Sequence, residues 1–145
     1  MNPDFREFIR SLNANRVRYL VVGGYAVAFH GHPRYTKDID IWLARDQENA
    51  EKIVQALVDF GFALLGLSVD DFLQPELIIQ LGYAPNRIDL MTDVSGVIFD
   101  DCYPKRTVEK MEDLEIDFID QESLIKNKRA SGRKQDLADL EILEQ

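Results

Sequence analysis

Two aspartates, Asp38 and Asp40, are separated by one residue in an otherwise apolar segment that ends at Leu43. If this segment is a strand, both carboxylates project from the same face, about 6.6 Å apart along the backbone. At that separation they repel each other by roughly 2.5 kcal/mol at an effective dielectric constant near 20. A divalent cation reverses the sign of that interaction. The pair therefore predicts a site for Mg²⁺ or Mn²⁺, since Mg²⁺ favours a few carboxylates together with substrate phosphates.

A third carboxylate is expected beside this pair. Asp89 lies between Ile88 and Leu90 in another predicted strand, and a neighbouring strand could place it next to the aspartates. Three carboxylates can hold two metal ions about 4 Å apart, which activate an attacking oxygen and stabilise the leaving one. Asp93 is the alternative third acid.

The Gly23-Gly24 pair provides the complementary half of a nucleotide site. It follows an apolar strand and precedes a short predicted helix, so backbone N–H groups can approach a phosphate. Arg34 and Lys37, in the loop that follows, can neutralise further charge. Gly-Gly alone is common in turns, and Asp-x-Asp alone is often a solvated strand edge. Their combination, with a third flanked aspartate, favours a functional site.

Hydrophobic periodicity and capping residues predict the elements that position these groups. Asp46 and Gly61 bound the clearest helix, whose apolar stripe includes Val58, and the last helix is expected to bury Leu137, Leu140 and Leu143. The predicted helices are 3–13, 25–29, 46–60, 121–131 and 134–144, with a turn at 68–72; the predicted strands are 17–22, 39–43, 62–65, 77–81, 87–91, 107–110 and 114–119; and 97–105 is ambiguous.

These elements predict an α/β or α+β fold, a mixed sheet with helices packed on it. The expected organisation is one domain over residues 1–145, in which 120–145 forms a C-terminal helical segment packed on the rest.

Composition narrows the class of protein. Hydrophobic residues make up 46% of the chain and charged residues 30%, as in a soluble globular protein. The net charge of −9 argues against a general coat for DNA or other nucleic acid. The apolar run at 19–29 is short and glycine-rich, so no membrane span is expected, and the single cysteine suits a cytoplasmic protein. Cys102 is expected to be a small buried side chain, and His30 and His32 loop residues rather than ligands.

The spacing of the glycines and aspartates resembles that of the DNA polymerase β superfamily of nucleotidyltransferases. Val22-Gly23-Gly24 is followed by thirteen residues and then by Asp38-Ile39-Asp40-Ile41. The fuller pattern is similar to a small bacterial branch near the abortive-infection and toxin–antitoxin nucleotidyltransferases. The residues that match this branch are Gly23, Gly24, Ala26, Gly31, Arg34, Thr36, Asp38 and Asp40.

The run from Ser123 to Leu140 resembles the same branch and concentrates five basic residues in an acidic chain. The resemblance implies that Lys128, with Arg133 or Lys134, lies near a triphosphate. A solvated helix face is the alternative.

The resemblance implies transfer of a nucleoside monophosphate from an NTP, with ATP as the expected donor, to a protein, RNA or small-molecule acceptor. Asp38, Asp40 and Asp89 would be the catalytic and metal-binding residues. Nucleotide-binding residues would be Gly23, Gly24, Arg34, Thr36, Lys37, Lys128, Arg133 and Lys134.

Two other functions stay open. One is a weakly catalytic or non-catalytic module that binds a nucleotide or a partner, such as the antitoxin-like half of a toxin–antitoxin pair; a partner protein or a homo-oligomer fits this reading. The other is an Asp-x-Asp glycosyltransferase, which fits the carboxylate pair but not the short chain or the Gly-Gly placement.

Overall fold

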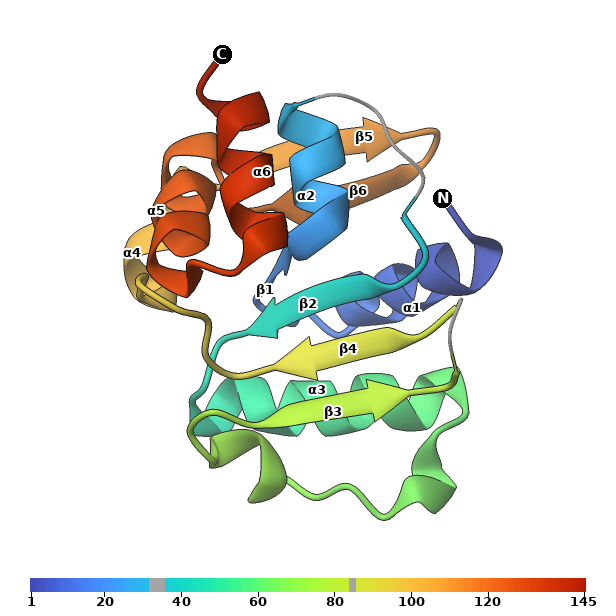
Figure 1. Cartoon of the computed structure of the whole chain (residues 1–145). Coiled ribbons are helices and arrows are strands. Elements are labelled where there is room, and N and C mark those ends of the chain that lie inside the picture. Colours follow the sequence, from blue (N-terminus) through green and yellow to red (C-terminus); the bar gives the residue numbers. More distant parts are fainter. Residues whose placement is uncertain (32–35, 84–85) are drawn as a thin grey trace.

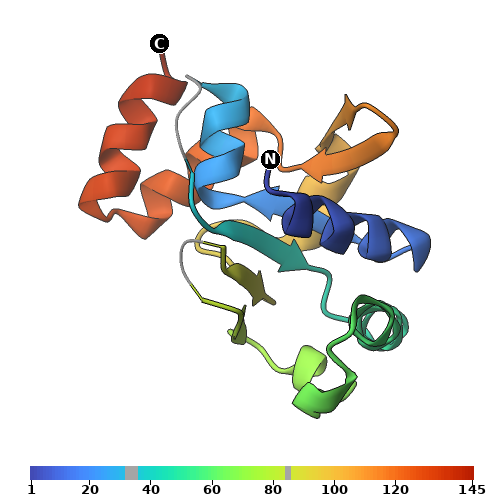
Figure 2. The same cartoon turned by 90° about the vertical axis from the view of Figure 1, so that its right-hand side faces the viewer.

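The computed structural model describes residues 1–31, 36–83 and 86–145 and contains one mixed sheet with helices on both faces (Figures 1 and 2). The predicted fold class is confirmed. The strands are β1 (Tyr19–Val22), β2 (Ile39–Leu43), β3 (Ile78–Leu81), β4 (Ile88–Met91), β5 (Thr107–Met111) and β6 (Leu114–Phe118). The helices are α1 (Pro3–Ala14), α2 (Gly23–His30), α3 (Gln47–Phe60), α4 (Phe99–Cys102), α5 (Gln121–Ser131) and α6 (Lys134–Leu143).

The strand order is β3-β4-β2-β1-β6-β5. β1 runs antiparallel to β2 and parallel to β6, and β2 runs parallel to β4. All four residues of β1 are buried, as expected for a central strand covered on both faces. The two hairpins, β3–β4 and β5–β6, therefore flank a central part made by β1 and β2.

The helices divide between the two faces of the sheet. Figure 2 shows α1 and α3 on one side, and α2, α5 and α6 on the other. α1 begins where Pro3 follows the cap Asn2, whose side chain accepts a hydrogen bond from the backbone N–H of Asp4. α3 is capped by Asp46 and ends at Gly61, whose φ of 102° is the left-handed conformation that glycine adopts easily.

Several local predictions are wrong. Residues 62–65 are not a strand, since Ala63–Leu65 form a 3₁₀ turn. α2 begins at Gly23 rather than at Tyr25, so the glycine pair belongs to the first helical turn. Val58 is 46% exposed, and Leu137 is 51% exposed.

The two exposed side chains have a geometric explanation. α3 buries Ala50, Ile53 and Leu57, and Val58 lies beyond the edge of that stripe. α6 turns a different face inward than its leucines suggest, with Asp136, Asp139, Leu140 and Leu143 at helical spacing. Two aspartates thus occupy inward positions where sequence patterning expects apolar residues.

The ambiguous segment 97–105 is α4 followed by a 3₁₀ turn at Tyr103–Lys105. It places Phe99 against Trp42, with ring centroids 5.2 Å apart. Cys102 is buried, as predicted. In the part of the chain that the structure describes, no helix is long and apolar enough to cross a membrane.

Candidate active site

The three predicted carboxylates gather where β2 and β4 begin. The strands are parallel, and their register makes Asp40 the direct partner of Asp89. Asp38 immediately precedes β2 and accepts a hydrogen bond from the backbone N–H of Arg87 at 3.1 Å. Ile39 is fully buried on the opposite face, so the alternation of the strand directs Asp40 towards α2 and α5.

Arg87 lies within this cluster and was not identified from the sequence. Its Nε donates to Oδ1 of Asp89 at 2.7 Å, and its Nη2 donates to Oδ2 at 3.1 Å. The same Nη2 lies 3.4 Å from Oδ2 of Asp38. The signal in the sequence is the spacing Arg-x-Asp, since residues two apart on an extended segment share a face.

The electrostatics of the cluster centre on Asp40. Burial raises the pKa of Asp40 to about 6, and both repulsion by Asp89 and a hydrogen bond with it act in the same direction. The positive charge of Lys128 acts in the opposite direction and lowers the pKa of Asp40. The site therefore carries more negative charge than its cations compensate, and it favours a positively charged ligand.

Gly23 allows Asp40 to approach the start of α2. Its φ is +65°, and a Cβ at this position would lie 2.1 Å from Oδ2 of Asp40. No side chain caps α2, whose first two residues are Gly23 and Gly24. A helix start without a side-chain cap, directly beside the carboxylates, suits an anionic group bound together with a cation.

Lys128 is almost fully buried, with 6% of its surface exposed. Its Nζ donates to Oδ1 of Asp136 at 2.9 Å and lies 3.3 Å from Oδ2 of Asp139. Arg133 donates from Nε to Oδ2 of Asp136 at 2.9 Å, and its side chain is 80% exposed. Lys134, at the start of α6, is also exposed. Lys128 thus joins α5 to α6, while Arg133 and Lys134 lie at the surface.

The remaining predicted residues are distributed differently. Thr36 is half-buried and Lys37 is exposed directly before Asp38, whereas Arg34 and His32 fall outside the described residues. Asp93, the alternative third acid, is exposed and accepts a hydrogen bond from the backbone N–H of Glu76 at 2.7 Å.

His30 lies in the last turn of α2, so its assignment to a loop is wrong. Its Nε2 is 2.6 Å from the carbonyl oxygen of Ile119, which ties α2 to the segment after β6.

The carboxylates fit a hard divalent cation by their oxygen chemistry, but they do not yet surround a common point. Within residues 1–31, 36–83 and 86–145, no three Asp, Glu, His or Cys side chains are arranged to hold a metal ion. Asp38 and Asp89 are directed instead at the guanidinium of Arg87. The donor set suits Mg²⁺ or Mn²⁺, and Arg87 occupies the position between two of the donors.

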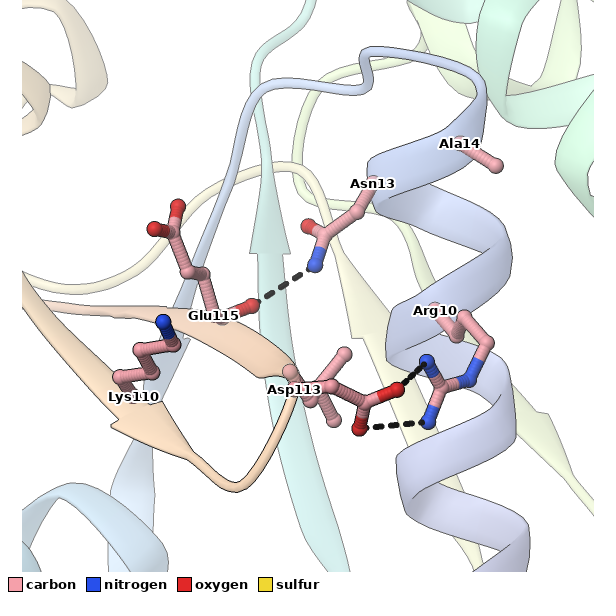
Figure 3. A pocket seen from close by; sticks show the side chains of 7 residues that line it. Arg10, Asn13, Ala14, Lys110, Asp113 and Glu115 are labelled. Atoms are coloured by element: carbon pink, nitrogen blue, oxygen red, sulfur yellow. Dashed lines mark hydrogen bonds and ion pairs between the residues drawn. The ribbon is translucent and has the colours of Figure 1, made fainter.

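A hollow of about 460 Å³ lies elsewhere, between α1 and the β5–β6 hairpin. Figure 3 shows its lining, in which Arg10 pairs with Asp113 and Asn13 donates to the backbone oxygen of Glu115. The guanidinium of Arg10 is already paired with Asp113 and is not available for a phosphate, so we do not assign a nucleotide to this hollow.

Comparison with protein families places the chain in a known family. The model of one family matches residues 4–144. The chain belongs to the family of nucleotidyltransferases of unknown function (DUF6036). This confirms the resemblance at the level of a nucleotidyltransferase. No curated protein matches the sequence.

Solved nucleotidyltransferase structures share the fold of this family member. The lincomycin-bound structure of the lincosamide antibiotic adenylyltransferase LnuA is 17% identical, with a TM-score of 0.56, over 99% of this chain and 96% of LnuA. A protein from Thermotoga maritima, assigned as a nucleotidyltransferase, is 18% identical with a TM-score of 0.59, over 94% of this chain and 88% of its own. At these identities the likeness concerns the fold.

Proposed function

We propose that this nucleotidyltransferase moves a nucleoside monophosphate from an NTP to an acceptor hydroxyl with the help of Mg²⁺ or Mn²⁺. The observation that carries the proposal is the direct pairing of Asp40 with Asp89, beside Asp38 and against the glycine start of α2. ATP is the proposed donor, in line with an adenylyltransferase among the fold neighbours.

The residues have distinct proposed roles. The start of α2 and Lys37 hold the phosphates, with Thr36 beside them, and Arg133 and Lys134 approach from the α5–α6 hairpin. When bound, the divalent ion supplies charge neutralisation and polarises the phosphoryl oxygens. Asp38, Asp40 and Asp89 provide its oxygen ligands. Arg34 remains a proposed phosphate contact from the sequence.

Lys128 has a different proposed role. Its buried pairs with Asp136 and Asp139 hold the ammonium in place, so it compensates charge near Asp40 without leaving its partners. Buried charges of this kind are fixed by the hydrogen bonds around them.

In the transfer step the acceptor oxygen forms a bond to the α-phosphorus, and the bond from that phosphorus to the bridging oxygen breaks. Pyrophosphate leaves with the bonding electron pair. As the third carboxylate of the pattern, Asp89 is the proposed acceptor of the hydroxyl proton, and it must first release the guanidinium of Arg87, which donates to both of its oxygens.

The test uses NTPs labelled at the α-phosphate, with Mg²⁺ or Mn²⁺, offered to lysate, total RNA and a panel of small hydroxyl compounds. We expect Asp38→Asn to lower transfer by about 100-fold or more, because a neutral amide is a poor ligand for a hard cation. Asp100→Asn, at a side chain that is 81% exposed on α4, is the matched control and should transfer normally. Full transfer by a folded Asp38→Asn protein would refute the assignment.

The acceptor panel separates three classes. LnuA binds lincomycin, so a lincosamide is included among the small molecules. A labelled protein of discrete size in lysate would instead support a protein acceptor, as in a toxin–antitoxin pair, and labelled RNA would support an RNA acceptor.

The arrangement of Arg87 favours a second candidate, a nucleotide- or partner-binding module with little catalysis. An arginine between the carboxylates takes positions that a cation would need. Saturable binding of Mg-ATP without transfer to any of the acceptors would support this candidate.

A further inference from the structure

The guanidinium of Arg87 forms a paired contact with one carboxylate of the site and a single contact with another. It donates two hydrogen bonds to Asp89 and lies 3.4 Å from Asp38. A planar guanidinium matches a carboxylate with two parallel hydrogen bonds, which makes this one of the stronger side-chain pairings. Two of the three proposed metal ligands therefore already share one positive charge that belongs to the chain itself.

We propose that Arg87 is an internal counter-ion that keeps the carboxylate site closed until a divalent cation displaces it. This inference rests on the proposed function, since it assigns a regulation to the same carboxylates. A cation and the guanidinium compete for the same oxygen atoms, so binding of one requires release of the other.

The surroundings of Arg87 allow such a release. Its side chain is 29% exposed, and its hydrogen bonds and ion pairs with described residues all go to Asp38 and Asp89. The backbone N–H of Arg87 separately holds Asp38 at 3.1 Å, so this contact can persist while the side chain turns away.

Lys128 is a cation that cannot play this part. Its side chain is 8% exposed and is paired with Asp136 and Asp139, whose own side chains are 2% and 0% exposed. Releasing Lys128 would take its ammonium group away from two buried carboxylates, of which Asp136 also pairs with the exposed Arg133. Arg87 is the exchangeable charge, and Lys128 is the fixed one.

The test measures Mn²⁺ binding to the whole protein without nucleotide, by electron paramagnetic resonance of free Mn²⁺ or by calorimetry. Arg87→Met removes the charge and the hydrogen bonds but keeps a long side chain. We expect it to bind Mn²⁺ at least about tenfold more tightly than wild type, because the ion no longer competes with a paired guanidinium.

Arg45→Met is the matched control. Arg45 is an exposed arginine beyond the other end of β2, and it donates to the backbone oxygen of Leu73. Arg45→Met changes the net charge by the same amount as Arg87→Met. If it also raised the affinity for Mn²⁺ by the same factor, the gain in Arg87→Met would be a general electrostatic effect. Such a result would overturn the inference.

Thermal unfolding with and without Mn²⁺ shows whether Arg87 is an exchangeable counter-ion or only part of a structural ion pair. Without metal, Arg87→Met should unfold at a lower temperature than wild type, because the carboxylates lose their cation. Saturating Mn²⁺ should raise its Tm by more than it raises that of wild type. Lower stability with an unchanged Mn²⁺ affinity would overturn the inference.

Asp38→Asn separates failure of this inference from failure of the metal site. If Asp38→Asn abolishes Mn²⁺ binding but Arg87→Met binds as wild type does, the carboxylate site stands and the counter-ion role is refuted. If the double variant Asp38→Asn/Arg87→Met binds Mn²⁺ as tightly as Arg87→Met alone, the ion is not at these carboxylates. The metal site and the counter-ion role of Arg87 are then both refuted. If neither the wild type nor Arg87→Met binds Mn²⁺, the metal site and the counter-ion role are both refuted as well.

Discussion

Replacement of Gly23 by alanine tests the contact on which the site geometry depends. The new Cβ would lie 2.1 Å from Oδ2 and 3.0 Å from Cγ of Asp40. Both distances are well inside van der Waals contact, so either the carboxylate or the start of α2 must move. The φ of +65° adds backbone strain for any residue that carries a Cβ.

The two contributions have different magnitudes. A non-glycine residue in the left-handed region costs about 1–2 kcal/mol. Forcing extra atoms into a packed position adds typically 1–3 kcal/mol. We therefore expect Gly23→Ala to lower the free energy of unfolding by about 2–5 kcal/mol.

Gly66→Ala provides the control, because Gly66 has a nearly equal φ of +69° and no neighbouring atom within 4 Å of its Cβ position. It should show the backbone strain alone, about 1–2 kcal/mol. Urea denaturation without metal, followed by circular dichroism, gives both values. The difference between the variants, about 1–3 kcal/mol, measures the close approach of Asp40.

A double-mutant cycle completes the experiment. Asp40→Ala removes the carboxylate, so the cost of Gly23→Ala should fall when both changes are combined. The Cβ of residue 40 remains, 3.2 Å from where the new Cβ of residue 23 would lie, and the relief is therefore incomplete. If Gly23→Ala destabilised the protein no more than Gly66→Ala does, α2 and β2 would not be as close as described.

Two further predictions concern buried polar groups. Asn49→Ala should lower the free energy of unfolding, measured in urea, by about 2–4 kcal/mol, because the buried Asn49 side chain accepts from the backbone N–H of Arg18 and donates to the backbone oxygen of Ala44. An effect below about 0.5 kcal/mol would show that water replaces the Asn49 side chain at these two backbone groups. Burial alone would raise the pKa of Asp136, but hydrogen bonds from Ser131, Lys128 and Arg133 outweigh it and hold the pKa below its usual range. The stability that ionised Asp136 contributes is thus complete above about pH 4 and is lost at lower pH, so the difference in thermal stability between wild type and Asp136→Asn should shrink as the pH falls below about 4; a constant difference would contradict this.

Regular elements with clear end signals were predictable from the sequence. Asn2, Asp46 and Asp120 each cap a helix by accepting a backbone hydrogen bond, as local sequence indicates. A capping residue predicts the start of a helix because the cap and the helix are neighbours in the chain. The alternation of Ile39 and Ile41 likewise fixed which face of β2 carries Asp40.

Features that depend on distant partners were not predictable. Asp136 and Asp139 can take inward positions because Lys128, on another helix, pairs with both. Helical patterning assigns such positions to apolar residues and therefore pointed to Leu137. The pairing of Arg87 with Asp89 is local and has a sequence signal, but its contact with Asp38 depends on a residue that lies far away in the sequence. The register places Asp40 beside Asp89, while the catalytic roles of the three carboxylates remain predictions.

The parallel pairing of β1 with β6 has a consequence for synthesis of the chain. β1 pairs with β2, which follows it closely in the sequence, but its other edge pairs with β6, which carries Phe118 opposite Val21. At roughly 5–20 residues per second, that edge of a fully apolar strand stays open for on the order of several seconds. An unpaired apolar edge is a template for association with other chains. Nascent chains of this family member therefore expose an apolar strand edge until β6 has been synthesised.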